Sequence, residues 1–174
     1  MSSLRLVEEQ RSASAFPRAQ NSKEESKSAD IPDSGSRTVL LVEDNPTDVF
    51  VMKEALEACG LGLQVRIARN GQDALLYFEE LARVENAPCP VLVLLDLNLP
   101  RVDGVEVLRQ IRSSLRCQRT PVIVVTSSTA EVDRAAVQRL GAEAYFEKPR
   151  KLVGYTELTQ VIRRVLGGRE ESPE

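Results

Sequence analysis

The stretch VLVLLDLNLP, residues 91–100, indicates the fold class of this chain, because an apolar run of strand length ends directly in the carboxylate of Asp96. Charged or hydroxyl side chains also follow three other strand-like stretches: Glu43 and Asp44 after residues 39–42, Thr126 after 122–125, and Lys148 after 144–147. In a parallel sheet the carboxyl ends of the strands meet at one edge, where open α/β sheets carry their sites. The sequence therefore predicts that these side chains share one crevice.

Strand-like and helix-like segments alternate five times along the chain. Strands are expected at 39–42, 63–68, 91–95, 122–125 and 144–147, and helices at 46–59, 73–84, 104–115, 131–140 and after residue 147. Asn45 followed by Pro46 is a helix start signal, and Gly141 is a helix stop signal. Such alternation predicts an α/β fold, with a parallel sheet covered by helices on both faces.

Length and composition favour one globular domain. The chain has 174 residues, of which 42% are hydrophobic and 28% charged. Residues 1–36 and 167–174 are poor in clustered apolar residues and are expected to be disordered, which leaves a folded domain at 37–166. A net charge of -3 disfavours direct nucleic-acid binding. No segment resembles a signal peptide or a membrane span, so we expect a cytoplasmic protein without membrane insertion.

The cysteines carry no recognisable motif. Cys59, Cys89 and Cys117 are odd in number and far apart, and the chain has no histidine. We therefore expect neither a disulfide scaffold nor a zinc site, and a reducing compartment.

Charge predicts the chemistry of the crevice. Three carboxylates brought close together repel one another and need a cation. Hard oxygen ligands that leave room for phosphate oxygens suit Mg²⁺. Lys148 adds a positive charge for phosphate, Thr126 can donate a hydrogen bond to it, and Asp96 can act as a nucleophile that forms an acyl phosphate.

These residues resemble the receiver domains of two-component response regulators, over about residues 38–166. The resemblance implies a flavodoxin-like (βα)5 fold, doubly wound, with strand order 2-1-3-4-5. It makes Asp96 the phospho-acceptor and places Mg²⁺ on Glu43, Asp44, Asp96 and the backbone carbonyl of Asn98. It also makes Thr126 and Tyr145 the switch pair, Lys148 the phosphate-binding lysine, and Gly104 a turn glycine, and it implies a cis peptide before Pro149.

The same resemblance implies a signalling protein rather than an enzyme acting on other substrates. Asp96 would accept a phosphoryl group from a sensor histidine kinase, with self-catalysed transfer and autodephosphorylation. The sequence of residues 42–48 and 95–100 is most similar to that of the stand-alone receivers associated with bacterial phytochromes, which suggests a phytochrome as the kinase.

No output domain is recognisable, so a stand-alone receiver is expected to signal through protein contacts. The expected surface is built by the fourth helix, fifth strand and fifth helix, and it is also a candidate homodimer face. Phe146, Tyr155 and Val161 are candidate residues on it.

Three other readings of the sequence remain open. In a haloacid dehalogenase-type phosphatase, an aspartate in the position of Asn98 would act as acid and base, which asparagine does not do. A pseudo-receiver would keep the fold as a fixed interaction module without phosphorylation. A lone nucleotide-binding domain lacks support because neither glycine-rich phosphate motif is present.

Overall fold

A computed structural model describes residues 37–167. The tail expected at 1–36 lies outside the described residues, and so does the end expected at 167–174 apart from Gly167, which is the last residue of a helix. In chain order the elements are β1 (Thr38–Val42), α1 (Pro46–Glu57), β2 (Gln64–Ala68), α2 (Gly71–Arg83), β3 (Leu92–Leu95), α3 (Gly104–Ser113), β4 (Val122–Thr126), α4 (Glu131–Arg139), β5 (Ala144–Glu147), a short 3-10 helix (Leu152–Tyr155) and α5 (Thr156–Gly167). No helix in this region is long and apolar enough to cross a membrane.

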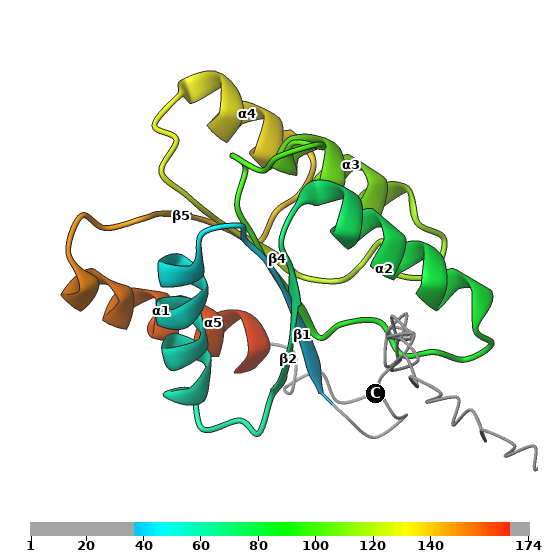
Figure 1. Ribbon diagram of the computed structural model, residues 1–174, viewed down its shortest axis with the longest axis horizontal. Helices are drawn as coiled ribbons and strands as arrows, with labels where there is room; N and C mark the ends of the chain where they lie inside the picture. Colours follow the sequence, from blue (N-terminus) through cyan, green and yellow to red (C-terminus); the bar gives the residue numbers. More distant parts are fainter. Residues whose placement is uncertain (1–36, 168–174) are drawn as a thin grey trace, which may run out of the picture.

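The five strands form one parallel sheet in the order β2-β1-β3-β4-β5, as expected. Helices α1 and α5 cover one face, and α2, α3 and α4 cover the other (Figure 1). The strand order reverses between β1 and β3, so the loops that follow these two strands diverge and leave a crevice at their carboxyl ends.

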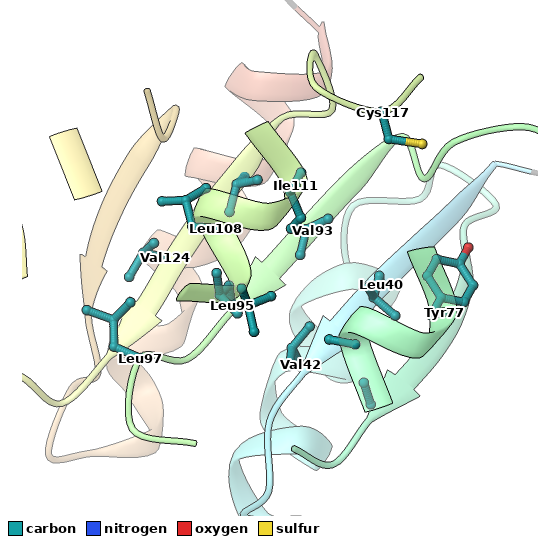
Figure 2. Packing of buried hydrophobic residues seen from close by; sticks show 14 of the residues in the cluster. Leu40, Val42, Tyr77, Val93, Leu95, Leu97, Leu108, Ile111, Cys117 and Val124 are labelled. Atoms are coloured by element: carbon teal, nitrogen blue, oxygen red, sulfur yellow. The ribbon is translucent and has the colours of Figure 1, made fainter. Parts of the chain in front are cut away.

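Alternation of side chains along each strand divides the core into two layers. Leu40, Val42, Val93, Leu95 and Val124 face α2 and α3, where they pack with Leu108 and Ile111 (Figure 2). The intervening residues face the other layer, with α1 and α5: Val39, Leu41, Leu92, Leu94, Ile123 and Val125. Because both faces of the sheet are covered, the central strands are apolar along their whole length.

Helix α3 ends at Ser113, two residues before the predicted end. Leu115, which matched the apolar spacing of the helix, is 96% exposed. Ser114 adopts an extended conformation and its Oγ accepts the backbone N–H of Cys117, which begins the turn into β4. The apolar spacing continued by coincidence beyond the helix.

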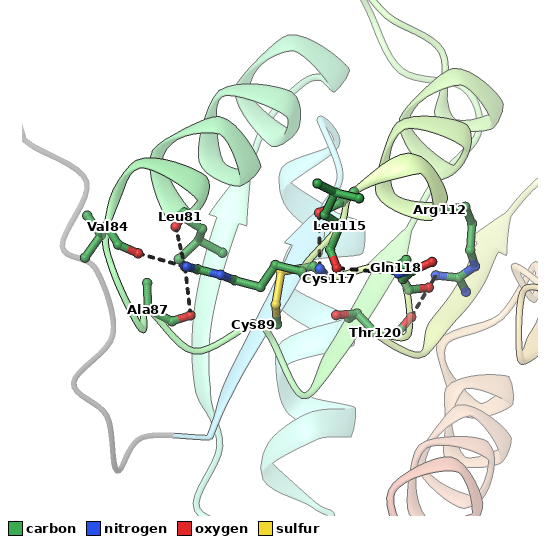
Figure 3. Close-up of a disulfide and its surroundings, with 11 residues drawn as sticks. Leu81, Val84, Ala87, Cys89, Arg112, Leu115, Cys117, Gln118 and Thr120 are labelled. Atoms are coloured by element: carbon green, nitrogen blue, oxygen red, sulfur yellow. Dashed lines mark hydrogen bonds between the residues drawn. A yellow bond between two sulfur atoms is a disulfide. The ribbon is translucent and has the colours of Figure 1, made fainter.

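The expectation of no disulfide is wrong. Cys89 and Cys117 form one, with a Cα–Cα separation of 5.6 Å (Figure 3). The fold brings the α2–β3 and α3–β4 loops together at the amino ends of neighbouring strands, although the two cysteines are 28 residues apart in the sequence. Cys59 is buried with a free thiol.

Candidate functional site

Asp96 lies at the centre of the carboxyl edge, directly after β3. It is 4% exposed. Its backbone N–H donates to the carbonyl of Val42 at 3.0 Å, and its Oδ1 accepts the N–H of Asn98 at 3.1 Å. Its other oxygen, Oδ2, lies 2.7 Å from Nζ of Lys148. The carboxylate is therefore held rigidly, with one oxygen directed at a positive charge.

Lys148 follows β5 and reaches across the crevice. Its Nζ contacts Oε2 of Glu43 at 2.7 Å and Oδ2 of Asp48 at 2.9 Å, in addition to Asp96. Burial alone would lower the pKa of Lys148, but hydrogen bonds to Asp96, Glu43 and Asp48 raise it above its ordinary value. Lys148 therefore stays protonated at neutral pH.

Glu43, Asp44 and Asp96 form a compact group of carboxylates. One oxygen from each lies within 4.8 Å of the others. Glu43 is fully buried, and burial raises its pKa, although the hydrogen bond and the charge of Lys148 oppose this shift. Asp44 is exposed. Three carboxylate oxygens at this spacing, open to solvent on the side of Asp44, fit a hard divalent cation that keeps some water ligands.

Asp48 is a member of the site that sequence reasoning missed. Asn45 caps α1 through its side chain, which accepts the N–H of Thr47 at 2.9 Å, and Pro46 occupies the first turn. This start places Asp48 in the first turn, from which it reaches Lys148. The available signal was its place in the first turn of a helix that begins directly after the acidic pair Glu43 and Asp44.

Tyr155 also belongs to this region and not to an exposed signalling face. It is 6% exposed, and its hydroxyl donates to Oδ1 of Asp48 at 3.3 Å. Burial, together with the charge of Asp48, raises the pKa of Tyr155 to about 12. Phe146 and Val161 are half-buried and pack against the same core layer. Tyr155 therefore cannot serve on the expected interaction surface.

Thr126 ends β4 and is fully buried. Its hydroxyl oxygen accepts Nδ2 of Asn98 at 3.5 Å and the backbone N–H of Ser128 at 3.2 Å. Asn98 is exposed, and its Nδ2 also lies 3.4 Å from Oγ of Ser127. The loops after β3 and β4 thus meet at Thr126 on the side of the crevice away from α1.

Tyr145 lies on β5 beside Val124 of β4 and is half-buried. Its hydroxyl donates to the backbone carbonyl of Ser128 at 2.7 Å, and the guanidinium of Arg134 lies 4.4 Å from the centre of its ring. Burial raises the pKa of Tyr145. The aromatic ring is thereby attached to the same loop whose amide binds Thr126.

Gly104 is the first residue of α3 and lies against the backbone of Asp96. Its N–H donates to the carbonyl of Leu97 at 2.9 Å, and a Cβ at this position would overlap the backbone carbonyl oxygen of Asp96. A glycine is therefore required here for α3 to approach the loop that carries the carboxylate.

Known proteins are similar to this chain in sequence and in fold. Residues 39–163 match the response regulator receiver domain family. The chain belongs to this family. The response regulator Rcp1 of Synechocystis is 36% identical over 126 residues, which are 72% of this chain and 86% of Rcp1. The phosphorylated cyanobacterial phytochrome response regulator RcpA is 32% identical with a TM-score of 0.70, covering 80% of this chain and 99% of that one.

Receivers similar to this one have been seen with divalent metals. A crystal structure of Rcp1 is of its Mn²⁺-bound form. The receiver domain of a sensor histidine kinase from Pseudomonas aeruginosa is 30% identical, with a TM-score of 0.60 and coverage of 76% of this chain and 98% of that one. In that structure a magnesium ion is coordinated in the active site cleft.

One detail implied by the family resemblance is wrong for this receiver. Within residues 37–167 no peptide bond is cis, so the bond between Lys148 and Pro149 is trans. The trans isomer is the one that most bonds before proline adopt.

Proposed function

We propose that this receiver accepts a phosphoryl group on Asp96 from the phosphohistidine of a sensor histidine kinase. The observation that carries the proposal is the buried Asp96 carboxylate with Lys148 at 2.7 Å, beside the carboxylate group of Glu43 and Asp44. A histidine kinase is the partner class with which response regulator receivers operate. The receiver is a signalling protein, and its own residues supply the positioning for phosphotransfer and for the later loss of the phosphoryl group.

In the transfer, a carboxylate oxygen of Asp96 forms a bond to phosphorus while the bond from phosphorus to the imidazole nitrogen breaks. The leaving imidazole keeps the electron pair and takes up a proton. Lys148 turns from its carboxylate partners to the phosphoryl oxygens, where its charge offsets the negative charge that the phosphoryl group brings. The Thr126 hydroxyl donates a hydrogen bond to one of these oxygens.

Glu43, Asp44, Asp96 and the backbone carbonyl of Asn98 would hold Mg²⁺. The bound ion supplies charge compensation for the acids and for the phosphoryl oxygens. The carboxylate spacing and the metals seen in related receivers support this assignment.

Phosphorylation is proposed to act through Thr126 and Tyr145. When the Thr126 hydroxyl turns to the phosphoryl group, it gives up the N–H of Ser128, whose carbonyl holds the Tyr145 hydroxyl. The loop then shifts and Tyr145 turns inward, which alters the surface of α4, β5 and α5. Couplings of this kind are commonly about 1–3 kcal/mol, so the response is graded.

The altered α4, β5 and α5 surface is the proposed homodimer face. Sedimentation of protein with and without a beryllofluoride phosphate mimic tests this. The mimic should strengthen self-association of the wild type and have less effect on Thr126→Ala. An association constant that is equal in all of these samples would exclude dimer-coupled signalling.

We propose a bacterial phytochrome as the kinase and the cytoplasm as the location. The phytochrome regulator RcpA among the similar structures supports this pairing. The proposed receiver domain spans residues 37–166, although α5 as described extends one residue further, to Gly167.

The proposed phosphorylation is tested by intact mass after incubation with phosphoramidate, with Mg²⁺ or with a chelator. One phosphoryl group should be added only with Mg²⁺, and Asp96→Asn should abolish the addition. Asp103→Asn is a matched control, because Asp103 caps α3 and asparagine caps helices equally well. Equal labelling of Asp96→Asn and wild type would show that Asp96 is not the acceptor.

A further inference from the structure

Ser128, in the loop between β4 and α4, connects the two residues of the proposed switch through its backbone. Its N–H donates to Oγ1 of Thr126 at 3.2 Å, and its carbonyl accepts the Tyr145 hydroxyl at 2.7 Å. Thr126 is fully buried, whereas Ser128 and Tyr145 are half-buried. A displacement of Ser128 would therefore change the hydrogen bonds of both switch residues at once.

Asp133 attaches the side chain of Ser128 to α4. Oγ of Ser128 donates to Oδ2 of Asp133 at 2.6 Å, and the same Oγ accepts the N–H of Ala130 at 3.3 Å. A carboxylate acceptor makes such a hydrogen bond stronger than one between neutral groups. The next residue of α4, Arg134, has its guanidinium 4.4 Å from the centre of the Tyr145 ring. The beginning of α4 thus contacts both the loop and the aromatic ring.

The hydrogen bond between Ser128 and Asp133 opposes the proposed switch. When the Thr126 hydroxyl turns to the phosphoryl group, the N–H of Ser128 loses its acceptor. A buried N–H without a partner is costly, so Ser128 must move until this N–H meets water or another acceptor. The bond to Asp133 resists that movement. It therefore stabilises the resting arrangement relative to the switched one.

Asp133 could also act only on the helix. Ala130 is the N-cap of α4 and makes no side-chain capping bond, so the contact between Ser128 and Asp133 organises the helix start in its place. A role confined to the helix would persist when the Thr126 hydroxyl is removed. A role in the switch would disappear, because the hydroxyl is the group that Ser128 releases. The two roles can therefore be separated in a Thr126→Ala background.

We propose that Asp133 is a positioning residue that holds the β4–α4 loop in its resting position and thereby opposes the turning of Thr126 to the phosphoryl group. The inference rests on the proposed function, because it concerns the switch formed by Thr126 and Tyr145. When Ser128 moves, its bond to Asp133 also carries the movement into α4, which is part of the proposed homodimer face.

The first test measures the binding of beryllofluoride to the full chain with Mg²⁺ by titration calorimetry. Asp133→Ala should bind the mimic about tenfold more tightly than the wild type, because the resting state loses a contact that opposes switching. Asp133→Asn keeps an acceptor oxygen and should fall between the two. Glu131→Gln is the matched control, because it removes an exposed carboxylate from the same helical turn, and it should bind like the wild type.

The same titration in the Thr126→Ala background separates the two roles of Asp133. Adding Asp133→Ala to Thr126→Ala should leave the affinity for beryllofluoride unchanged. An equal gain in affinity with and without the Thr126 hydroxyl would overturn the proposal and assign Asp133 to the helix start. An affinity that Asp133→Ala does not raise in the wild-type background would overturn it as well.

The second test needs no phosphate mimic. Hydrogen exchange of the Ser128 amide, followed by NMR in the unphosphorylated protein, should be about tenfold faster in Asp133→Ala and unchanged in Glu131→Gln. Equal exchange in Asp133→Ala and wild type would overturn the proposal. A wild type that does not bind beryllofluoride would instead refute the proposed function, and the exchange rate would still decide whether Asp133 holds the loop.

Discussion

Replacing Lys148 with methionine tests whether this lysine is the counter-ion of the acidic crevice. The change removes the positive charge within 2.9 Å of Glu43, Asp48 and Asp96. Methionine retains most of the apolar stem, so the variant mainly changes charge.

The expected loss follows from burial. Removing one partner of a buried ion pair commonly costs about 3–5 kcal/mol, because the other charge remains desolvated. The side chains of Lys148, Glu43 and Asp96 are 10%, 0% and 5% exposed, but that of Asp48 is 22% exposed and partly screened by water. We therefore expect a loss of about 3 kcal/mol in the free energy of unfolding, near the lower end of this range.

Divalent metal should reverse part of this loss. At a concentration about 100 times its dissociation constant, a ligand of the native state adds about 2.7 kcal/mol. At the same concentration, Mg²⁺ should stabilise Lys148→Met more than it stabilises the wild type. In the wild type the Lys148 ammonium repels the ion and occupies the carboxylates that would bind it, whereas the variant has no ammonium there.

The assay is urea unfolding followed by far-ultraviolet circular dichroism, since the chain contains no tryptophan. Each protein is measured with a chelator and with Mg²⁺. Lys151→Met is the matched control, because Lys151 is exposed and its loss should change stability by less than about 0.5 kcal/mol. If Lys148→Met and Lys151→Met are equally stable in chelator, or gain equally from Mg²⁺, the assignment of Lys148 as counter-ion is wrong.

Three further outcomes are expected. Gly104→Ala should destabilise the domain by about 1–3 kcal/mol and slow phosphorylation, because the added methyl group overlaps the backbone carbonyl of Asp96. The control is Gly167→Ala, whose added methyl group meets no atom within 4 Å and should leave thermal unfolding unchanged. Tyr155 should ionise near pH 12. Because folding raises its pKa, Tyr155 contributes stability that is fully present below about pH 10 and is lost as the pH rises towards 12. The difference in phenolate absorbance between the wild type and Tyr155→Phe measures this ionisation. Cys89→Ser should lower the unfolding free energy by about 3.5 kcal/mol, as expected for a cross-link over 28 residues, and dithiothreitol should lower that of the wild type equally but leave the variant unchanged.

Local sequence determined the elements and the edge at which the site lies. Apolar runs buried on both faces can be read as central strands, and β1, β3 and β4 begin and end within about one residue of their predicted bounds. Because the strands are parallel, the residues after them had to meet at one edge. The sequence alone therefore predicts that Glu43, Asp96 and Lys148 lie together, as they do in the structure.

Contacts between residues on different elements needed the tertiary structure. Asp48 contacts Lys148 only because α1 lies against the crevice. Tyr155 is buried because the segment before α5 packs against the same helix. Cys89 and Cys117 pair because β3 and β4 are neighbours in the sheet, which brings their preceding loops together. Periodicity reports on the structure of one segment, whereas these contacts depend on how separate segments pack, which the spacing of residues along one segment does not encode.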